Sequence, residues 1–448
     1  MKKLATHTLG CRLNQFETEK IAAKIEPFGF ERAGFDEVAD LYVINTCTVT
    51  HKADATCRQV ISNVARRKGH AKLAVVGCYV ESDRQRVAEL PGVDLVIGNR
   101  EKGRVTEMMA QEWPELFAVR PQAENNTPAC VSGVSEFYRR SRAWLKISDG
   151  CNQRCSFCII PTVRGPLRNN HAGNVIADIN QLVTAGYHEV VLTGVHIGHF
   201  KDKDNDVHSL ADLLKMILAE TDVSRLRLSS LEPQVVDDDI VSFMAENTQR
   251  VCRYLHLPLQ SGSDAILSAM RRPYDSARYL EVVTSLKKAI DGITIGGDVI
   301  VGFPGESAED FERTCEVADS GAMDYLHVFT YSDRTGTKAS AIEEKVDPQV
   351  VARRHRRLRQ ISQRRLAEAH TRTVGTTVSA ISENYDDESR RWWGVTDNYL
   401  RILLPQGVGG DRVIHAVLAE SVVDGNLIGA KRLVNEVTVP KTLSASLL

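Results

Sequence analysis

Short apolar runs alternate with helix-like segments along most of this 448-residue chain, and this alternation is the feature that most restricts its fold. From residue 143 onward, six such runs read AWLKIS, HEVVLTG, RLRLSS, YLHLPLQ, TIGGDVIVG and YLHVFTY. The segments between them are long enough for crossover helices, which parallel strands require. The pattern predicts a partial (βα)6 barrel, with reactive side chains on the loops that follow the strands.

The two ends of the chain show different patterns of apolar and polar residues. The runs LATHTLG, LYVINT, KLAVVG and DLVIG alternate with amphipathic segments in the first hundred residues, which predicts a parallel α/β sheet. After residue 375, closely spaced segments such as TTVSAI, RWWGVT and YLRILLP predict a small all-β barrel. We therefore expect an α/β domain over 1–120, a linker over 121–142, the central barrel with a basic helix over 143–370, and a β-barrel over 371–437.

Charge and hydropathy exclude several classes of protein. The chain has 56 basic and 58 acidic residues, so contact with nucleic acid must come from local clusters and not from overall charge. The N-terminus turns polar at once, and no apolar run of about 18 residues is present. We expect a soluble cytoplasmic protein that does not contact a membrane.

Three cysteines, Cys151, Cys155 and Cys158, follow the first predicted barrel strand in the stretch SDGCNQRCSFCIIP. Thiols in a reducing compartment favour metal binding or catalysis over disulfides. Zinc would require a fourth ligand, and no second pair lies nearby, whereas three thiolates on a 4Fe-4S cluster leave one iron open. Phe157, between the last two cysteines, is placed to cover such a cluster or to lie against an adenine.

A second set of cysteines is spread over the N-terminal sheet. Cys11, Cys47 and Cys78 each fall at the end of a predicted strand. The carboxyl ends of parallel strands line one crevice, so these thiols are expected to meet there, although three unrelated buried thiols would give the same pattern. We interpret four further cysteines as ordinary buried or free thiols: Cys57, Cys130, Cys252 and Cys315.

The spacing C-x3-C-x-aromatic-C after the first strand of a βα pattern resembles the radical S-adenosylmethionine superfamily. Later pieces resemble its cofactor-contacting strands, although each alone is also ordinary turn chemistry. The resemblance implies that Thr193 and Gly194 of VVLTGVH lie beside the methionine amino group of the cofactor. It also implies polar cofactor contacts at Gln260 and Ser261 of LHLPLQSGS, and a close approach of adenine to the backbone at Gly302 of GGDVIVGFPGE.

The whole chain narrows this resemblance. The stretches TLGCRLNQFETE, INTCTVTHKADATCRQ and VVGCYVE, together with the second cysteine loop and the terminal β module, resemble the methylthiotransferases. That family implies two 4Fe-4S clusters, one on each cysteine trio, and S-adenosylmethionine. The first cluster cleaves the cofactor to a radical that abstracts hydrogen from an aromatic carbon, and the second holds the sulfur that is methylated and transferred. The sequences NTCTVTHKADA and GCRLNQFETE most resemble those of the branch that modifies N6-threonylcarbamoyladenosine beside the tRNA anticodon.

The resemblance also implies partners: the anticodon stem-loop of tRNA, an electron donor of flavodoxin or ferredoxin type, and a possible sulfur donor. The terminal barrel corresponds to a TRAM-like RNA-binding domain. The run VARRHRRLRQISQRRL holds seven arginines and predicts a helix with a basic face, which is either a phosphate-binding or a merely solvated surface. We expect RNA contacts at the following residues: Arg164, Arg353, Arg356, Arg357, Lys431 and Arg432.

Other functions stay open at this point. A methylthiotransferase acting on isopentenyladenosine in tRNA, or on an aspartate of a ribosomal protein, would share both trios. A non-catalytic iron-sulfur protein that binds RNA and senses redox state would share the cysteines without cleaving S-adenosylmethionine. Glu232 in SSLEP either orients substrate or cofactor, or simply begins a helix.

Overall fold

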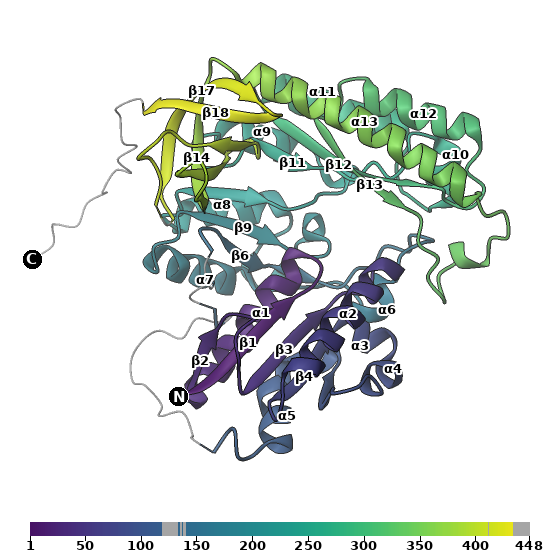
Figure 1. Ribbon diagram of the computed structural model, residues 1–448. Helices are drawn as coiled ribbons and strands as arrows, with labels where there is room; N and C mark the ends of the chain where they lie inside the picture. The colour runs from purple at the N-terminus through teal and green to yellow at the C-terminus, as the bar shows by residue number, and fades with distance from the viewer. Residues whose placement is uncertain (119–132, 135–136, 138–139, 411, 433–448) are drawn as a thin grey trace, which may run out of the picture.

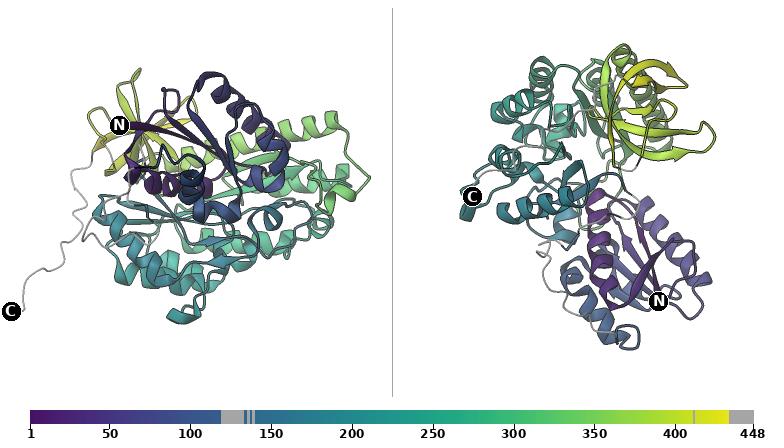
Figure 2. Two further views of the ribbon diagram at one scale, coloured as in Figure 1. Left: turned by 90° about the horizontal axis from the view of Figure 1, so that it is seen from below. Right: turned by 90° about the vertical axis from the view of Figure 1, so that its left-hand side faces the viewer.

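The computed structural model describes residues 1–118, 133–134, 137, 140–410 and 412–432. An N-terminal α/β domain lies against one side of a central α/β body, and a small β-barrel packs against one end of that body (Figures 1 and 2). The predicted fold class is thereby confirmed. The predicted boundaries at 120 and 437 lie outside the described residues, and the predicted domain bounds stay predictions.

The N-terminal domain is built on a five-stranded parallel sheet with the order β2-β1-β3-β4-β5. The central strands β3 and β4 are almost entirely buried, which fits their runs of Val, Ile and Leu. The elements of this domain are β1 (Lys2–Thr8), α1 (Arg12–Ile25), β2 (Phe30–Ala33), β3 (Leu41–Thr46), α2 (His51–Arg67), β4 (Lys72–Gly77), α3 (Cys78–Ser82), α4 (Arg84–Ala88), β5 (Leu95–Ile97) and α5 (Val105–Glu112). The edge strand β2, only four residues long, was not among the predicted strands.

The central body has all six predicted strands, and all of them pair in parallel. Two sheets, β10-β9-β6 and β11-β12-β13, are joined by bridges from Leu226 to Val251 and from Ser230 to His256, which gives a partial barrel. The strands are β6 (Ala143–Lys146), β9 (Glu189–Thr193), β10 (Arg225–Leu228), β11 (Tyr254–His256), β12 (Thr294–Val301) and β13 (Tyr325–Thr330).

Helices cover the outer side of these strands (Figure 1). They are α7 (Ala172–Thr184), α8 (Leu210–Glu220), α9 (Asp238–Glu246), α10 (Asp264–Ala269), α11 (Ser276–Ala289), α12 (Ala308–Asp319) and α13 (Pro348–Thr373). The short helix α6 (Ile160–Arg164) lies beside α3 of the N-terminal domain. A short antiparallel pair, β7 (Ser148–Asp149) with β8 (Arg168–Asn169), brackets the cysteine loop. The predicted basic helix is α13, which begins with a proline after the capping carboxylate of Asp347.

The C-terminal domain is a closed barrel with the order β14-β15-β16-β18-β17. Its strands are β14 (Thr377–Asp386), β15 (Arg391–Thr396), β16 (Arg401–Leu403), β17 (Ile414–Val423) and β18 (Asn426–Arg432). Two arginines of β10 in the central body donate hydrogen bonds to carbonyls of this barrel. Arg225 donates to the carbonyls of Ser379 and Val395. Arg227 donates to those of Thr396 and Asp397. Among the described residues, no helix is both long and apolar enough to cross a membrane.

Candidate functional site

The N-terminal trio meets at one rim of its sheet, as its positions predict. Cys11 follows β1 and precedes α1, Cys47 follows β3, and Cys78 begins α3 directly after β4. Gly10 has a φ of +97°, and a Cβ there would lie 2.9 Å from the Sγ of Cys47, so only glycine allows this approach. Burial raises the pKa of the Cys47 thiol to about 12, and the nearby Cys11 and Cys78 add to the effect. The three cysteines therefore lie at neighbouring strand ends, close enough for Cys11 and Cys78 to act on the Cys47 thiol.

The second trio lies on the loop between β7 and α6. The backbone N–H groups of Gln153 and Ile160 donate to the Sγ atoms of Cys151 and Cys158, at 3.3 and 3.4 Å. Burial raises the pKa of the Cys158 thiol to about 12, and the other two cysteines add to the rise. Gly150 begins the loop with a φ of +71°, and a Cβ there would lie only 2.0 Å from the carbonyl oxygen of Pro166.

A buried ion network joins the two cysteine regions. Arg164, at the end of α6, donates to Glu17 at 3.0 Å, to Asp149 at 3.0 Å and to the side-chain oxygen of Asn14 at 2.5 Å. Burial alone would raise the pKa of Glu17, but Lys102 and Arg164 hold it well below its usual range. In this structure the Arg164 guanidinium is enclosed and faces protein acceptors, and its predicted RNA contact stays a prediction.

Asparagines that the sequence analysis missed complete this junction. Asn99 donates to the Sγ of Cys78 at 3.1 Å and to the carbonyl of Val163 at 2.8 Å, and thus connects the N-terminal trio to α6. Asn14 donates to the carbonyls of Leu9 and Thr46, which fixes the loops that carry two of the cysteines. The only signal for Asn14 in the sequence is its place one turn after Cys11, which is a weak one.

Thr193 and Gly194 lie where the prediction puts them, at the carboxyl end of β9. Gly194 has no room for a side chain, since a Cβ would lie 2.2 Å from the Oγ of Ser148. A neighbouring pocket opens between the ends of β9, β10 and β11 and is lined by Val195, His196, Ile197, Gly198, Ser230, Leu231, Glu232 and Pro258. Phe157 packs against the apolar cluster of Phe303 and Met270, with Ile300 and Tyr331 beside it. These residues stay candidates for cofactor contact.

Two other predicted cofactor residues contact neighbouring helices in this structure. Ser261 is fully buried, and its hydroxyl lies 3.2 Å from that of Thr314 on α12, so it faces away from the strand ends. Gly302 has a φ of +73°, but the group that approaches it is Val351 of α13, whose Cγ2 would lie 2.4 Å from a Cβ. Helix packing by itself therefore requires glycine at 302, and the predicted approach of adenine to this backbone stays a prediction.

Gln260 remains a candidate for contact with the cofactor. Its φ of +66° is unusual for a residue other than glycine, and its backbone bridges to β12 through Asp298 and Ile300. Strained backbone of this kind often occurs at functional sites.

Glu232 and Arg272 form a charged pair beside the second trio. Arg272 donates to the Sγ of Cys155 at 3.0 Å and makes an ion pair with Glu232, which lines the pocket. Burial acts to lower the pKa of Arg272, but Tyr274 and Cys155 raise it overall. A guanidinium against a cysteine sulfur stabilises the thiolate form that iron requires. Glu232 thus lines the pocket beside this trio and also directly precedes a short 3-10 helix (Pro233–Val235), so its role toward substrate or cofactor stays a prediction.

The predicted RNA surface on α13 is exposed at Arg353, Arg356 and Arg357. Arg357 is bound by Glu312 of α12, whereas in the described part of the chain no ion pair joins Arg353 or Arg356 to a carboxylate. Lys431 and Arg432 lie on β18, but their side chains are outside the described residues. The basic face is therefore partly neutralised by a neighbouring helix.

The donor sets fit iron-sulfur clusters. Each site offers three thiols, held by glycine-dependent loops and joined by N–H donors to sulfur, and hydrogen bonds of that kind tune such clusters. Cys57, which lies next to Cys47, donates its thiol to the carbonyl of Cys47 at 3.2 Å and is fully buried, in agreement with its interpretation as an ordinary thiol. The raised thiol pKa values mean that iron would have to displace protons on binding.

Comparisons with known proteins agree with this arrangement. A model for the uncharacterized protein family UPF0004 matches residues 3–98, and one for the radical SAM superfamily matches residues 145–318. The chain is 37% identical over 416 residues to the threonylcarbamoyladenosine tRNA methylthiotransferase MtaB of Bacillus subtilis (strain 168), across 90% of each chain. It is 34% identical to the protein of the same name from Aquifex aeolicus (strain VF5), across 90% of this chain and 100% of that one.

A tRNA-2-methylthio-N(6)-dimethylallyladenosine synthase from Clavibacter michiganensis subsp. michiganensis (strain NCPPB 382) is also 34% identical, across 92% of this chain and 80% of that one. Among solved structures, the radical S-adenosylmethionine methyltransferase TsrM from Kitasatospora setae, with cobalamin and a 4Fe-4S cluster bound, has a TM-score of 0.53 at 15% identity. That match covers 74% of this chain and 75% of that chain, and at this identity it shows the fold alone.

Proposed function

Since this chain belongs to the radical S-adenosylmethionine methylthiotransferase family, in the branch of the MtaB relatives, we propose that it adds a methylthio group to C2 of N6-threonylcarbamoyladenosine in tRNA. The two relatives with the name MtaB support the choice of substrate. The modified base lies next to the anticodon, so the RNA partner in this proposal is the anticodon stem-loop. An electron donor of flavodoxin or ferredoxin type and a sulfur donor complete the proposed partners.

One observation carries the proposal: two separate sets of three cysteines, from two domains, border one junction. In the proposal, Cys151, Cys155 and Cys158 hold one 4Fe-4S cluster. The other is held by Cys11, Cys47 and Cys78. When bound, the clusters and S-adenosylmethionine supply one-electron cleavage chemistry and the methylthio group.

The side chains of the protein would orient and shield this chemistry. Arg272 donates to Cys155 and pairs with Glu232, so it stabilises a thiolate next to the pocket at the ends of β9, β10 and β11. Arg164, Asn14 and Asn99 hold the N-terminal rim against the cysteine loop. In the proposal, this junction keeps both trios close to one substrate.

The decisive experiment is mass spectrometry of tRNA nucleosides from a deletion strain, with and without the gene restored. We expect the methylthio form of N6-threonylcarbamoyladenosine to disappear and to return. If instead the isopentenyl-type methylthio nucleoside changed, or a ribosomal protein lost the added mass, the proposed substrate would be wrong. Purified protein that failed to cleave S-adenosylmethionine under reducing conditions would favour the redox-sensor alternative.

Cysteine variants test the two cluster sites. Cys155→Ala and Cys47→Ala should each lose about half of the bound iron, because each removes one of two four-iron clusters. Cys57→Ala is the matched control, since this thiol touches the backbone of Cys47 and yet is not a proposed ligand. Loss of iron in Cys57→Ala, or full iron in either of the first two variants, would contradict the assignment.

A further inference from the structure

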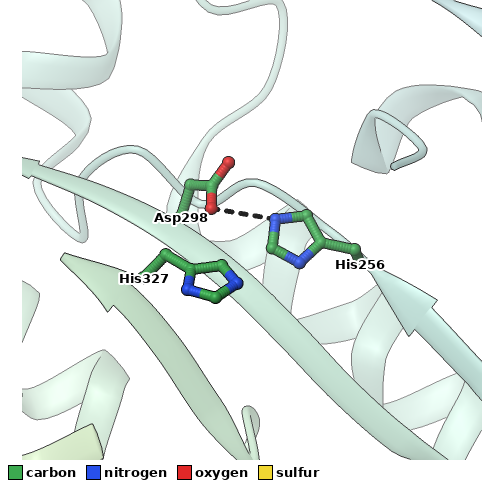
Figure 3. Close-up of side chains that lie close together, drawn as sticks. All are labelled: His256, Asp298 and His327. Atoms are coloured by element: carbon green, nitrogen blue, oxygen red, sulfur yellow. Dashed lines mark ion pairs between the residues drawn. The ribbon is translucent and has the colours of Figure 1, made fainter. Parts of the chain in front are cut away.

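Polar and aromatic side chains form a ladder on one face of the strands β11, β12 and β13. Alternate residues of a strand share a face, so Tyr325 and His327 follow one another along β13 as Tyr254 and His256 do along β11. Asp298 of β12 pairs in register with His327, and its Oδ1 lies 2.9 Å from the Nε2 of His256. Figure 3 shows these two imidazoles and the carboxylate converging from three adjacent strands.

The part of this ladder nearest the C-terminal barrel consists of aromatic side chains. The Tyr325 ring lies across Gly296, where a Cβ would be 2.4 Å from its Cζ. Its hydroxyl lies 2.5 Å from that of Tyr254, and the Tyr254 ring stacks at 4.3 Å on Tyr399 of the C-terminal barrel. Glycine in β12 thus allows a flat tyrosine surface where the central body and the terminal barrel meet.

Arg12 brings a positive charge to this surface from the third domain. It is the residue after Cys11, its guanidinium lies 5.3 Å from the ring centroid of Tyr399, and it donates to the Tyr399 hydroxyl. It is also close enough to His327 to help lower the pKa of that imidazole, an effect that comes first from burial. The ladder is therefore lined by residues from all three domains.

Among the described residues, Arg12 forms no ion pair. In the described part of the chain, no carboxylate oxygen lies within 4.0 Å of its guanidinium. The neighbouring Arg225 and Arg227 differ, since both bind the buried Glu189. The one carboxylate of the ladder, Asp298, is already paired with His256. A half-buried cation without a partner is costly unless a ligand supplies the opposite charge.

We propose that Arg12, with Tyr399 and His327, binds the carboxylate of an amino acid attached to the substrate adenine. This inference rests on the proposed function, because the threonylcarbamoyl group carries such a carboxylate and an isopentenyl group does not. The planar guanidinium matches a carboxylate with two parallel hydrogen bonds, and the tyrosine surface covers its apolar side. A neutral, apolar substituent would leave Arg12 unpaired, so the same contact selects between the two kinds of substrate.

A binding cycle with two proteins and two RNAs tests this contact. The proteins are the wild type and Arg12→Gln, both full-length and cluster-loaded, without S-adenosylmethionine so that no turnover occurs. The RNAs are anticodon stem-loops with N6-threonylcarbamoyladenosine or with its primary amide, which lacks the carboxylate. Fluorescence anisotropy should show that the wild type binds the acid about 10- to 100-fold more tightly than the amide, and that Arg12→Gln binds both alike.

The cycle stays informative even if Arg12→Gln weakens binding in general, because it compares preferences and not affinities. Arg12→Lys keeps the charge without the fork and should retain only part of the preference. Equal binding of acid and amide by the wild type, or an unchanged preference in Arg12→Gln, would overturn the inference. If the wild type still modified the threonylcarbamoyl stem-loop in that case, the proposed function would survive; if it did not, the proposed function would fail first.

A metal analysis covers the other chemistry that these residues offer. The ligand atoms of His256, Asp298 and His327 all lie within 4.8 Å of one another, a spacing that suits a divalent cation. We expect no metal beyond cluster iron in the purified protein. A further cation that is lost in His327→Ala and kept in Arg12→Gln would overturn the inference, since that cation would take the carboxylate in place of Arg12.

Discussion

Replacement of Glu189 by glutamine should loosen the attachment of the C-terminal barrel to the central body. Glu189 is fully buried on β9, and its carboxylate binds Arg225 at 2.5 Å and Arg227 at 2.7 Å, with Arg142 at 3.6 Å. The same arginines donate to barrel carbonyls, including that of Thr396 at 2.9 Å. One carboxylate thus neutralises the cations that join two domains.

The magnitude follows from burial. Removal of one partner of a buried ion pair leaves an uncompensated charge and costs about 3–5 kcal/mol. Glutamine keeps the size of the side chain, so the loss would come from charge and not from a cavity. Arg227 has no exposed surface, and water cannot replace the lost carboxylate without opening the interface. We therefore expect Glu189→Gln to lower the free energy of unfolding by about 3–5 kcal/mol.

Denaturant unfolding, followed by tryptophan fluorescence, measures this change, because Trp392 and Trp393 lie on barrel strand β15. The matched control is Glu312→Gln, which breaks the exposed pair with Arg357 and should change the unfolding midpoint little. A loss of less than about 1 kcal/mol in Glu189→Gln would refute the reasoning, because it would mean that the buried arginines do not need this charge.

The pH dependence gives a second check on Glu189. Burial alone would raise its pKa, but Arg225 and Arg227 hold it far below the usual range. A depressed folded-state pKa adds stability that is present above the unfolded pKa of about 4.3 and is lost as the pH falls below it. The difference between wild type and Glu189→Gln should therefore be constant from about pH 8 to pH 5 and shrink only in more acidic solution.

Three further variants separate structural from functional roles. Arg164→Met should cost about 3 kcal/mol in unfolding free energy, since it leaves Glu17 without one of its buried partners, and should not change the salt dependence of tRNA binding. Arg356→Ala should show the reverse, with unchanged stability and a salt slope reduced by about one unit, if its exposed guanidinium contacts phosphate. Gly150→Ala should lose the iron of one cluster, because the added Cβ would clash with Pro166. Gly173→Ala should keep all of its iron, because a Cβ there has only one neighbouring atom, at 3.9 Å. Equal iron contents in the two variants would contradict the role of the loop.

Much of the fold could be predicted because its signals are local. The six central strands and the five strands of the terminal barrel are apolar runs bounded by turns, and all of them are found. Strand β2 was missed because four residues that begin with Phe30 and include Glu31 and Arg32 do not form an apolar run. It forms because β1 offers it a parallel edge and Phe30 is buried there, which is a tertiary effect.

The residues of the functional site could be predicted less completely than the fold. The cysteine positions follow from the strand ends, since parallel strands end at a common rim. The roles of Ser261 and Gly302 could not be predicted, because a buried hydroxyl and a glycine with positive φ look the same in sequence whether they face a cofactor or a neighbouring helix. Thr314 and Val351, their actual neighbours, lie about fifty residues further along the chain.

Arginine shows most clearly what the sequence leaves open. Arg164 binds Glu17, 147 residues away, and Arg227 binds Glu189, 38 residues away, so the acid that neutralises each arginine is set by topology and not by proximity in the chain. An arginine with a buried carboxylate partner joins parts of the protein, whereas an exposed arginine that forms no ion pair among the described residues, such as Arg356, is available to phosphate. Arg12 fits neither description, because it is half-buried and has no carboxylate partner among the described residues. A substrate carboxylate would supply the opposite charge at this position, and the acid and amide stem-loops are designed to test for it.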